Sequence, residues 1–336
     1  TWDQNRYTNW QKKLLGGTSK ITNINASVSG GSAQTQFLVS GTYSRETTVM
    51  PGDFSYNRVN LRTNLNHVSE NQRFKINFTS GYGIQDNSQA SKDLTIEAWT
   101  LPPNAPALYN DQGELNWENN TFQNPLRYLN GAAKSKTYDL VANSVLSYTL
   151  FQGLDLKGSF GYNDLRHHES TTYPSTMYNP SGGFTSEDSY IYYTDTARRS
   201  WIIEPQLNWK AEISSLKTDI LIGSTFQRQN NKSLSMNGYG YTSNNMLYNP
   251  AAATDLFILG FDDSVYKYQS LFGRANFNWK DRYILNLTTR RDGSSRFGPR
   301  KRFAWFGAFG AAWIFSKEKI FQDNSVLSFG KLRTSY

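Results

Sequence analysis

The sequence predicts an all-β fold, namely an antiparallel transmembrane β-barrel segment of about twelve strands. Three observations predict it. Apolar and polar residues alternate from residue 21 to the end of the chain, the links between the alternating segments are short and long in turn, and aromatic residues are abundant. The first is the period of a strand with one apolar face. The other two favour a membrane barrel over a soluble sheet.

The expected strands follow the alternation in chain order, with apolar side chains on one parity and mainly Asn, Ser, Thr, Lys and Gly on the other. They cover residues 24–28, 37–43, 59–65, 74–84, 140–148, 154–162, 201–209, 220–226, 271–279, 283–289, 303–313 and 326–336. Helical periodicity is scarce, and a short helix is expected only at residues 91–100.

The links between these strands alternate in length. Short links are expected at residues 30–35, 69–72, 150–153, 210–215, 280–282 and 316–325, and longer ones at 47–55, 87–136, 164–199, 228–265 and 292–301. Outer-membrane barrels have short periplasmic turns and long extracellular loops, and tilted strands of about 9–11 residues cross the hydrocarbon. A soluble sandwich gives no reason for such an asymmetry.

The longest apolar run, residues 303–315, supports strands over helices as the spanning elements. As a helix it would reach about 20 Å, which is short of a hydrocarbon core of about 30 Å, whereas as a strand it would reach about 43 Å. No apolar run of about 18 residues, which a spanning helix needs, occurs in the sequence.

Aromatic residues on this strand give an expected depth in the membrane. Trp305 and Trp313 share a parity, and their spacing corresponds to about 26 Å along a strand, or about 20 Å along the membrane normal at a tilt of about 40°. That approaches the apolar band of about 25 Å between aromatic girdles. We therefore expect Trp305, Trp313, Trp201 and Trp209 at the membrane interfaces. The opposite parity is small and apolar where a water-filled lumen would favour charge, so we expect a plug to pack against Ala304, Phe306, Ala308, Gly310 and Ala312.

Composition argues against several functional classes. The chain has 35 Lys and Arg against 27 Asp and Glu, a net charge of +8, but the basic residues are scattered except in residues 290–302, so nucleic acid is not an expected partner. There is no cysteine, and the adjacent His167 and His168 would face opposite sides of a strand. We expect no enzyme site, no cofactor and no metal; the acidic pair at 262–263 and residues 86–87 lack the spaced oxygen ligands of a calcium loop.

The long links are expected to form an extracellular binding surface, because links of this length in a compact domain are usually functional. Exposed aromatic rings can stack on sugars and peptides. The candidate ligand-binding residues are Trp99, Trp117, Tyr178, Tyr241 and Tyr248. The alternative is that these rings pack loop against loop.

Several segments resemble one transporter family. Residues 270–283, SLFGRANFNWKDRY, lead into residues 290–299, RRDGSSRFGP; residues 309–313 and 330–336 continue the pattern, and residues 25–32 resemble an early hairpin. Together they resemble the SusC/RagA family of TonB-dependent transporters. Turn chemistry explains the Gly and Pro of the second motif, but it does not explain the cluster of Arg290, Arg291, Arg296, Arg300 and Arg302. These cations could bind lipopolysaccharide phosphates or acidic partners, or be solvated or paired internally.

The resemblance implies that residues 1–336 are part of one TonB-dependent receptor-like barrel domain in the outer membrane of a Gram-negative bacterium. A barrel of about 22 strands is then expected, with this chain roughly its N-terminal half and with the plug domain, the TonB box and the remaining strands outside it. The implied partners are a SusD-like surface lipoprotein, the TonB complex acting through the plug, and outer-membrane lipid with lipopolysaccharide. The implied function is import of a glycan, oligosaccharide or peptide. A passive pore, a structural barrel component of a larger surface complex, and a soluble β-rich adhesin are the alternatives.

Overall fold

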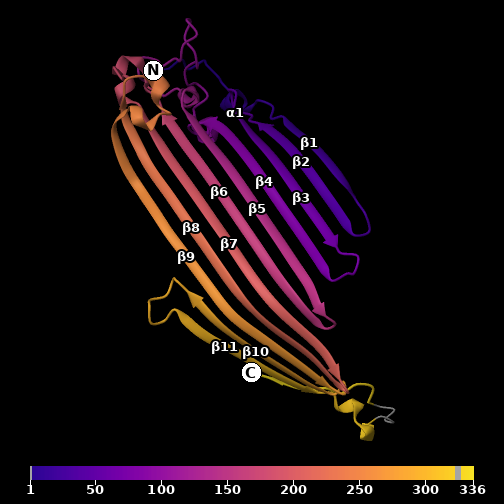
Figure 1. Cartoon of the computed structure of the whole chain (residues 1–336). Helices are drawn as coiled ribbons and strands as arrows, with labels where there is room; N and C mark the ends of the chain where they lie inside the picture. Colours follow the sequence, from indigo (N-terminus) through magenta and orange to yellow (C-terminus); the bar gives the residue numbers. More distant parts are fainter. Residues whose placement is uncertain (1, 322–326) are drawn as a thin grey trace.

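The computed structural model describes residues 2–321 and 327–336. Twelve strands form one antiparallel sheet in which every strand pairs with its neighbour in sequence, with β1 and β12 at the two edges. Figure 1 shows this sheet as one curved layer, with the N-terminal segment and three of the longer connections, residues 91–131, 174–189 and 242–252, gathered at one end of the strands. The expected all-β fold and its twelve antiparallel strands are confirmed.

The strands lengthen steadily from β1 to β9 and then shorten. Their bounds are β1 (Ile21–Gly31), β2 (Thr35–Thr47), β3 (Ser55–Val68), β4 (Phe74–Ala90), β5 (Ala132–Phe151), β6 (Leu154–Tyr173), β7 (Tyr190–Ile213), β8 (Leu216–Tyr241), β9 (Ala253–Trp279), β10 (Tyr283–Ser294), β11 (Phe303–Trp313) and β12 (Leu332–Ser335). We call the end of the sheet with the β1–β2, β3–β4, β5–β6, β7–β8 and β9–β10 connections the turn end, and the opposite end the loop end.

The expected alternation of short and long connections is present, but the long links are shorter than predicted. Residues 87–136, 164–199 and 228–265 were expected as loops, whereas β7, β8 and β9 have 24, 26 and 27 residues and extend far into the last two of these segments. The reason is that a ladder of backbone hydrogen bonds can continue beyond the segment with an apolar face. Where both faces of a strand are wetted, the apolar-polar alternation fades while the pairing continues.

The last predicted strand is also shorter than expected. The strand β12 covers only Leu332–Ser335, and the backbone of Tyr336 continues its pairing with β11 through two hydrogen bonds to Phe309, both of 2.8 Å. Residue 326 lies outside the described part of the chain, as do residues 322–325 of the predicted link before it. The first part of that link forms two single 3₁₀ turns, Phe315–Lys317 and Lys319–Phe321.

The register places the apolar parity of each strand beside that of the next, so one continuous surface, the apolar face, runs across the sheet. Residues opposite each other in an antiparallel pair share a face. Such rows are Ile24, Tyr43, Val59, Ile84 and Tyr138 across β1–β5, and Phe160, Ile203 and Phe226 across β6–β8. The other side, the polar face, contains paired amides such as Asn66 with Asn77 and Asn276 with Asn286.

Tight turns fix this register at the turn end. In the β9–β10 connection, Lys280 and Asp281 have φ of 55° and 52°, and the amide of Arg282 donates to the carbonyl of Trp279 at 3.0 Å. Two successive left-handed residues are the signature of a type I′ turn, whose twist matches the strands it joins. Lys217 and Asp281 form an ion pair at 3.0 Å that ties this turn to the neighbouring β7–β8 turn.

The buried core lies at the loop end instead of on the sheet. Helices α1 (Trp10–Leu15) and α2 (Thr95–Thr100) pack together with the β4–β5 connection. The cluster consists of Trp10, Leu14, Leu94, Ala98, Ala105, Leu108, Phe122 and Leu126. Helix α2 lies within the predicted helical segment 91–100, whereas α1 was not predicted. No helix in the described residues is long and apolar enough to cross a membrane.

Candidate ligand-binding groove

A groove at the loop end brings together two of the predicted ligand-binding residues. Trp117 in the β4–β5 connection and Tyr178 in the β6–β7 connection both line a cavity of about 640 Å³. The side-chain amide of Asn130 donates to the carbonyl of Thr176 at 2.7 Å and so holds the two connections together. We call this cavity the loop groove.

Trp117 is held at the groove by a strained turn. The three following residues, Glu118, Asn119 and Asn120, have φ of 46°, 53° and 67°. Asn tolerates the left-handed conformation, whereas at Glu118 it costs about 1–2 kcal/mol, so the surroundings of the turn must fix it there. Immediately after it, Phe122 is buried in the core cluster. Strain of this kind is often found at binding sites, which favours a role for the groove beyond loop packing.

The walls of the groove offer two chemistries that suit a polar ligand with flat faces. Tyr178 packs against Phe184 with ring centroids 4.6 Å apart, and five asparagines, Asn110, Asn116, Asn119, Asn130 and Asn179, line the same cavity. The only charged lining side chains in the described part of the chain are Glu114 and Glu118. The groove is therefore suited to neutral or cationic polar ligands and disfavours anionic ones.

A polar clamp joins the β6–β7 and β8–β9 connections beside the groove. The hydroxyl of buried Ser189 donates to the Oδ1 of Asn244 at 2.6 Å, and the Nδ2 of Asn244 donates to the hydroxyl of Ser175 at 3.1 Å. The amide of Ser175 in turn donates to the Ser189 hydroxyl at 2.7 Å. This closed network positions Tyr178, only three residues after Ser175.

A ladder of aromatic rings lies on the strands next to the groove. Tyr173, Tyr190 and Tyr239 stack across β6, β7 and β8, with ring centroids 4.6 and 5.4 Å apart. Tyr192 and Phe257 meet this stack edge-on at 5.7 and 5.8 Å. We call these five residues the tyrosine ladder.

The tyrosine ladder lies on the polar face. Tyr190 is an odd number of residues from Trp201 along an unbroken register, so the two side chains project from opposite faces of β7. Burial raises the pKa of Tyr190, and the neighbouring Tyr178, which lines the groove, raises it further. Parity counted from Trp201 places Tyr190 on the polar face, but residues 164–199 were predicted as a loop, so Tyr190 was not a predicted site residue.

The other three predicted ligand-binding residues lie elsewhere. Trp99, on α2, is 71 % exposed and lies outside the loop groove. Tyr248 is 46 % exposed, with the ammonium of Lys134 stacked 4.3 Å from its ring centre. Tyr241 is fully buried with Ile191 and Leu247. Its ring is therefore closed to a ligand in this structure, in line with the alternative of packing between loops.

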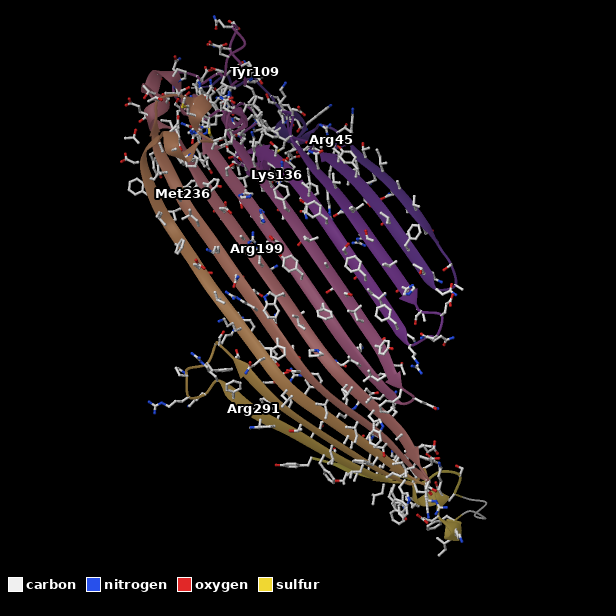
Figure 2. The ribbon with its side chains drawn as sticks, viewed as in Figure 1. Arg45, Tyr109, Lys136, Arg199, Met236 and Arg291 are labelled. Atoms are coloured by element: carbon white, nitrogen blue, oxygen red, sulfur yellow. The ribbon has the colours of Figure 1, made fainter. Side chains whose placement is uncertain are left out.

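The predicted girdle residues lie on the apolar face at two levels. Trp201 and Trp305 are the loop-end members, and Trp209 and Trp313 the turn-end members, of β7 and β11. At the turn end Trp313 stacks parallel to Tyr283 at 6.5 Å. The five predicted plug-facing residues lie on the polar face of β11, where register pairs Phe306 with Arg290 and Ala304 with Asp292. Figure 2 shows the side chains over the sheet, with Tyr109 marking the loop end.

No protein-family model matches the chain. It is 25 % identical over 346 residues to TonB-dependent receptor P3 of Formosa agariphila, an alignment that covers 98 % of this chain and 34 % of the relative. TonB-dependent receptor SusC of Bacteroides thetaiotaomicron is 39 % identical over 67 residues, which are 20 % of this chain and 7 % of SusC.

The chain resembles SusC-type TonB-dependent receptors. The RagAB peptide importer in its open-open state superimposes with a TM-score of 0.73 at 20 % identity, covering 99 % of this chain and 38 % of the importer chain. The SusC-like sheet is thus a segment of an outer-membrane β-barrel, as the sequence predicted. The chain spans about a third of the length of the Formosa agariphila receptor P3. The apolar face is then the lipid-facing side and the polar face the lumen side.

Proposed function

We propose that this chain forms part of the barrel of a TonB-dependent importer and that the loop groove binds the nutrient before it enters the lumen. The observation that carries the proposal is the convergence of Trp117 and Tyr178, from separate connections, on one groove. Tyr173 and Tyr190 of the tyrosine ladder flank the connection that contains Tyr178. Aromatic rings and amides arranged in this way would suit an oligosaccharide or a peptide, which are the two nutrient classes we propose.

The proposal extends to the parts and partners that such an importer requires. Residues 1–336 would belong to one barrel domain, completed by further strands and a plug, because the edges β1 and β12 would otherwise leave backbone groups unpaired in lipid. The plug would pack on the small residues of β11, from Ala304 to Ala312, and link the barrel to the TonB complex. A SusD-like surface lipoprotein would cover the loop end. The RagAB importer, to which the chain is similar in fold, is titled a peptide importer.

The test compares binding and uptake by the complete transporter with and without the groove aromatics. Purified protein is titrated with hexasaccharides of glucose and xylose and with mixed decapeptides, and uptake is followed in cells with and without TonB. Each lost aromatic contact should cost about 0.5–1.5 kcal/mol, so the double variant Trp117→Ala and Tyr178→Ala should bind about tenfold more weakly.

Trp99→Ala is the matched control, since Trp99 is an exposed aromatic of the same connection that does not line the groove. Unchanged binding by the double variant would refute the groove as the binding site. Uptake that persists without TonB would instead support the passive-pore alternative.

A further inference from the structure

The lipid-facing side of the barrel contains a second cavity with a composition unlike that of the loop groove. It has a volume of about 420 Å³ and lies over β7–β11, where its apolar lining includes Trp201, Phe226 and Phe303. Gly293 makes room for it, because a Cβ at this position would come within 2.4 Å of the Phe303 ring. Arg228, Lys267 and Arg302 also line the cavity.

Register places these cations beside the loop-end girdle. Trp201 on β7 is directly opposite Arg228 on β8, and Arg228 is directly opposite Lys267 on β9. Trp201 is the predicted interface residue of its strand, and Phe226 lies one apolar-face position closer to the turn end than Arg228. The cavity therefore combines an apolar floor at the edge of the hydrocarbon with a cationic rim at the depth of the lipid headgroups.

In the described part of the chain, no carboxylate forms an ion pair with a cation of this rim. Within residues 2–321 and 327–336, Arg228, Lys267 and Arg302 are in none of the ion pairs, and all three are exposed. The adjacent Arg291 is likewise free of carboxylates and stacks on the rings of Phe303 and Trp305 at 4.6 and 5.7 Å. Figure 2 labels Arg291 on this part of the sheet.

Other cations on the same face of the sheet form ion pairs with carboxylates. On the same face of β6 and β7, Asp164 binds Arg166 at 3.3 Å and Arg199 at 2.9 Å. Further toward the loop end Lys232 binds Asp263 at 3.1 Å. Within the described chain Arg166, Arg199 and Lys232 are thus paired with carboxylates, whereas the cations that surround the cavity, Arg228 of β8 among them, are not.

We propose that this cavity binds a phosphorylated glycolipid of the outer leaflet, of the lipopolysaccharide kind. The planar guanidinium groups of Arg228 and Arg302 would bind phosphate through paired hydrogen bonds, and the ammonium of Lys267 would add a point charge. The rings of Trp201, Phe226 and Phe303 would contact the sugar faces and the first carbons of the acyl chains. The site faces away from the lumen, so it is independent of nutrient binding in the loop groove.

The experiment uses the complete transporter in detergent, with lipid A as the probe and dephosphorylated lipid A as its counterpart. Wild-type protein should bind lipid A at least tenfold more tightly than the dephosphorylated form, a comparison that needs no variant. The triple variant Arg228→Gln, Lys267→Gln and Arg302→Gln should weaken lipid A binding by tenfold or more, since each surface cation contributes about a fivefold factor.

The matched control is the triple variant Arg166→Gln, Arg199→Gln and Lys232→Gln, which removes the same charge from the same face at paired positions. It should keep wild-type binding, and heat-modifiable gel mobility checks that both barrels are folded. Equal binding of phosphorylated and dephosphorylated lipid A would overturn the proposal. So would equal losses in the two triple variants, or an acidic protein recovered in place of lipid after cross-linking at Lys267.

Discussion

Removing the side-chain amide of Asn124 should loosen the loop end without altering the sheet. Asn124 is fully buried. Its Nδ2 donates to the carbonyls of Leu108 at 2.6 Å and Asn116 at 3.1 Å, and its Oδ1 accepts from the amide of Leu126 at 3.0 Å. At about 1 kcal/mol for each hydrogen bond, Asn124→Ala should destabilise the β4–β5 connection by about 3 kcal/mol.

That loss corresponds to an increase of about two orders of magnitude in the local opening equilibrium, because 1.4 kcal/mol is a factor of about ten. Hydrogen exchange on the complete transporter measures it directly. Amides of residues 105–126 should lose about a hundredfold of their protection, while those of β7 and β8 keep theirs, since the bonds that are lost lie within the connection.

Gln123→Ala provides the control, because Gln123 is the exposed neighbour of Asn124 and its side-chain oxygen accepts a hydrogen bond from the exposed guanidinium of Arg127 at 2.9 Å. It should change protection by no more than about a factor of two. If Asn124→Ala exchanged no faster than Gln123→Ala, the inference that these three bonds organise the connection would be wrong. The Asn124 variant should also weaken ligand binding, since Trp117 belongs to the same connection.

Three further predictions concern the sheet and the ladder. Gly153→Ala should destabilise the barrel by about 2 kcal/mol or more in urea, because Gly153 has φ of +90° and a Cβ there would lie 2.2 Å from the Lys210 carbonyl oxygen; Gly260→Ala, with no atom within 4 Å, should cost far less. Burial raises the pKa of Tyr190 above the ordinary value, so a titration of the tyrosines followed at 295 nm should include a late-ionising group that is lost in Tyr190→Phe. Because the pKa of Tyr190 is higher in the folded than in the unfolded protein, the free energy of unfolding keeps its full value below a pH of about 10. It falls as the pH rises through the folded pKa. Trp305→Ala should lower the stability of the inserted barrel by about 1–2 kcal/mol, Trp305→Phe by much less, and equal urea midpoints for the two would contradict a girdle role.

The sheet could be predicted from sequence because every second residue of a strand lies on the same face, so that an apolar face appears as apolar residues at every second position. Rows such as Phe160, Ile203 and Phe226 follow from parity alone, and so does the separation of Trp305 from Phe306. The limits of β7, β8 and β9 could not be predicted, because outside the hydrocarbon neither face needs to be apolar and the pattern that reveals a strand disappears.

The candidate site was predicted only in part, for a different physical reason. Trp117 and Tyr178 were chosen as aromatic residues in long connections, but their convergence depends on contacts between connections, such as Asn130 with Thr176, that no local pattern records. Tyr241 was predicted wrongly for the same reason. In the sequence it is an aromatic residue of a long connection, whereas in the structure its ring lies in a buried cluster. Gly238 makes room for the ring, because a Cβ at residue 238 would lie 2.5 Å from the Tyr241 hydroxyl.

Because the turns and the loops of this chain lie at opposite ends of the strands, each side of the membrane can be labelled separately. The sequence contains no cysteine. A cysteine introduced at Gln152 in the β5–β6 turn, or at Asn245 between β8 and β9, is therefore the single thiol of this chain. A maleimide that cannot cross the membrane would reach residue 245 in intact cells, and residue 152 only once the envelope is opened. The same pair of positions, carrying fluorophores in turn, would report motion on each side of the membrane separately during a transport cycle.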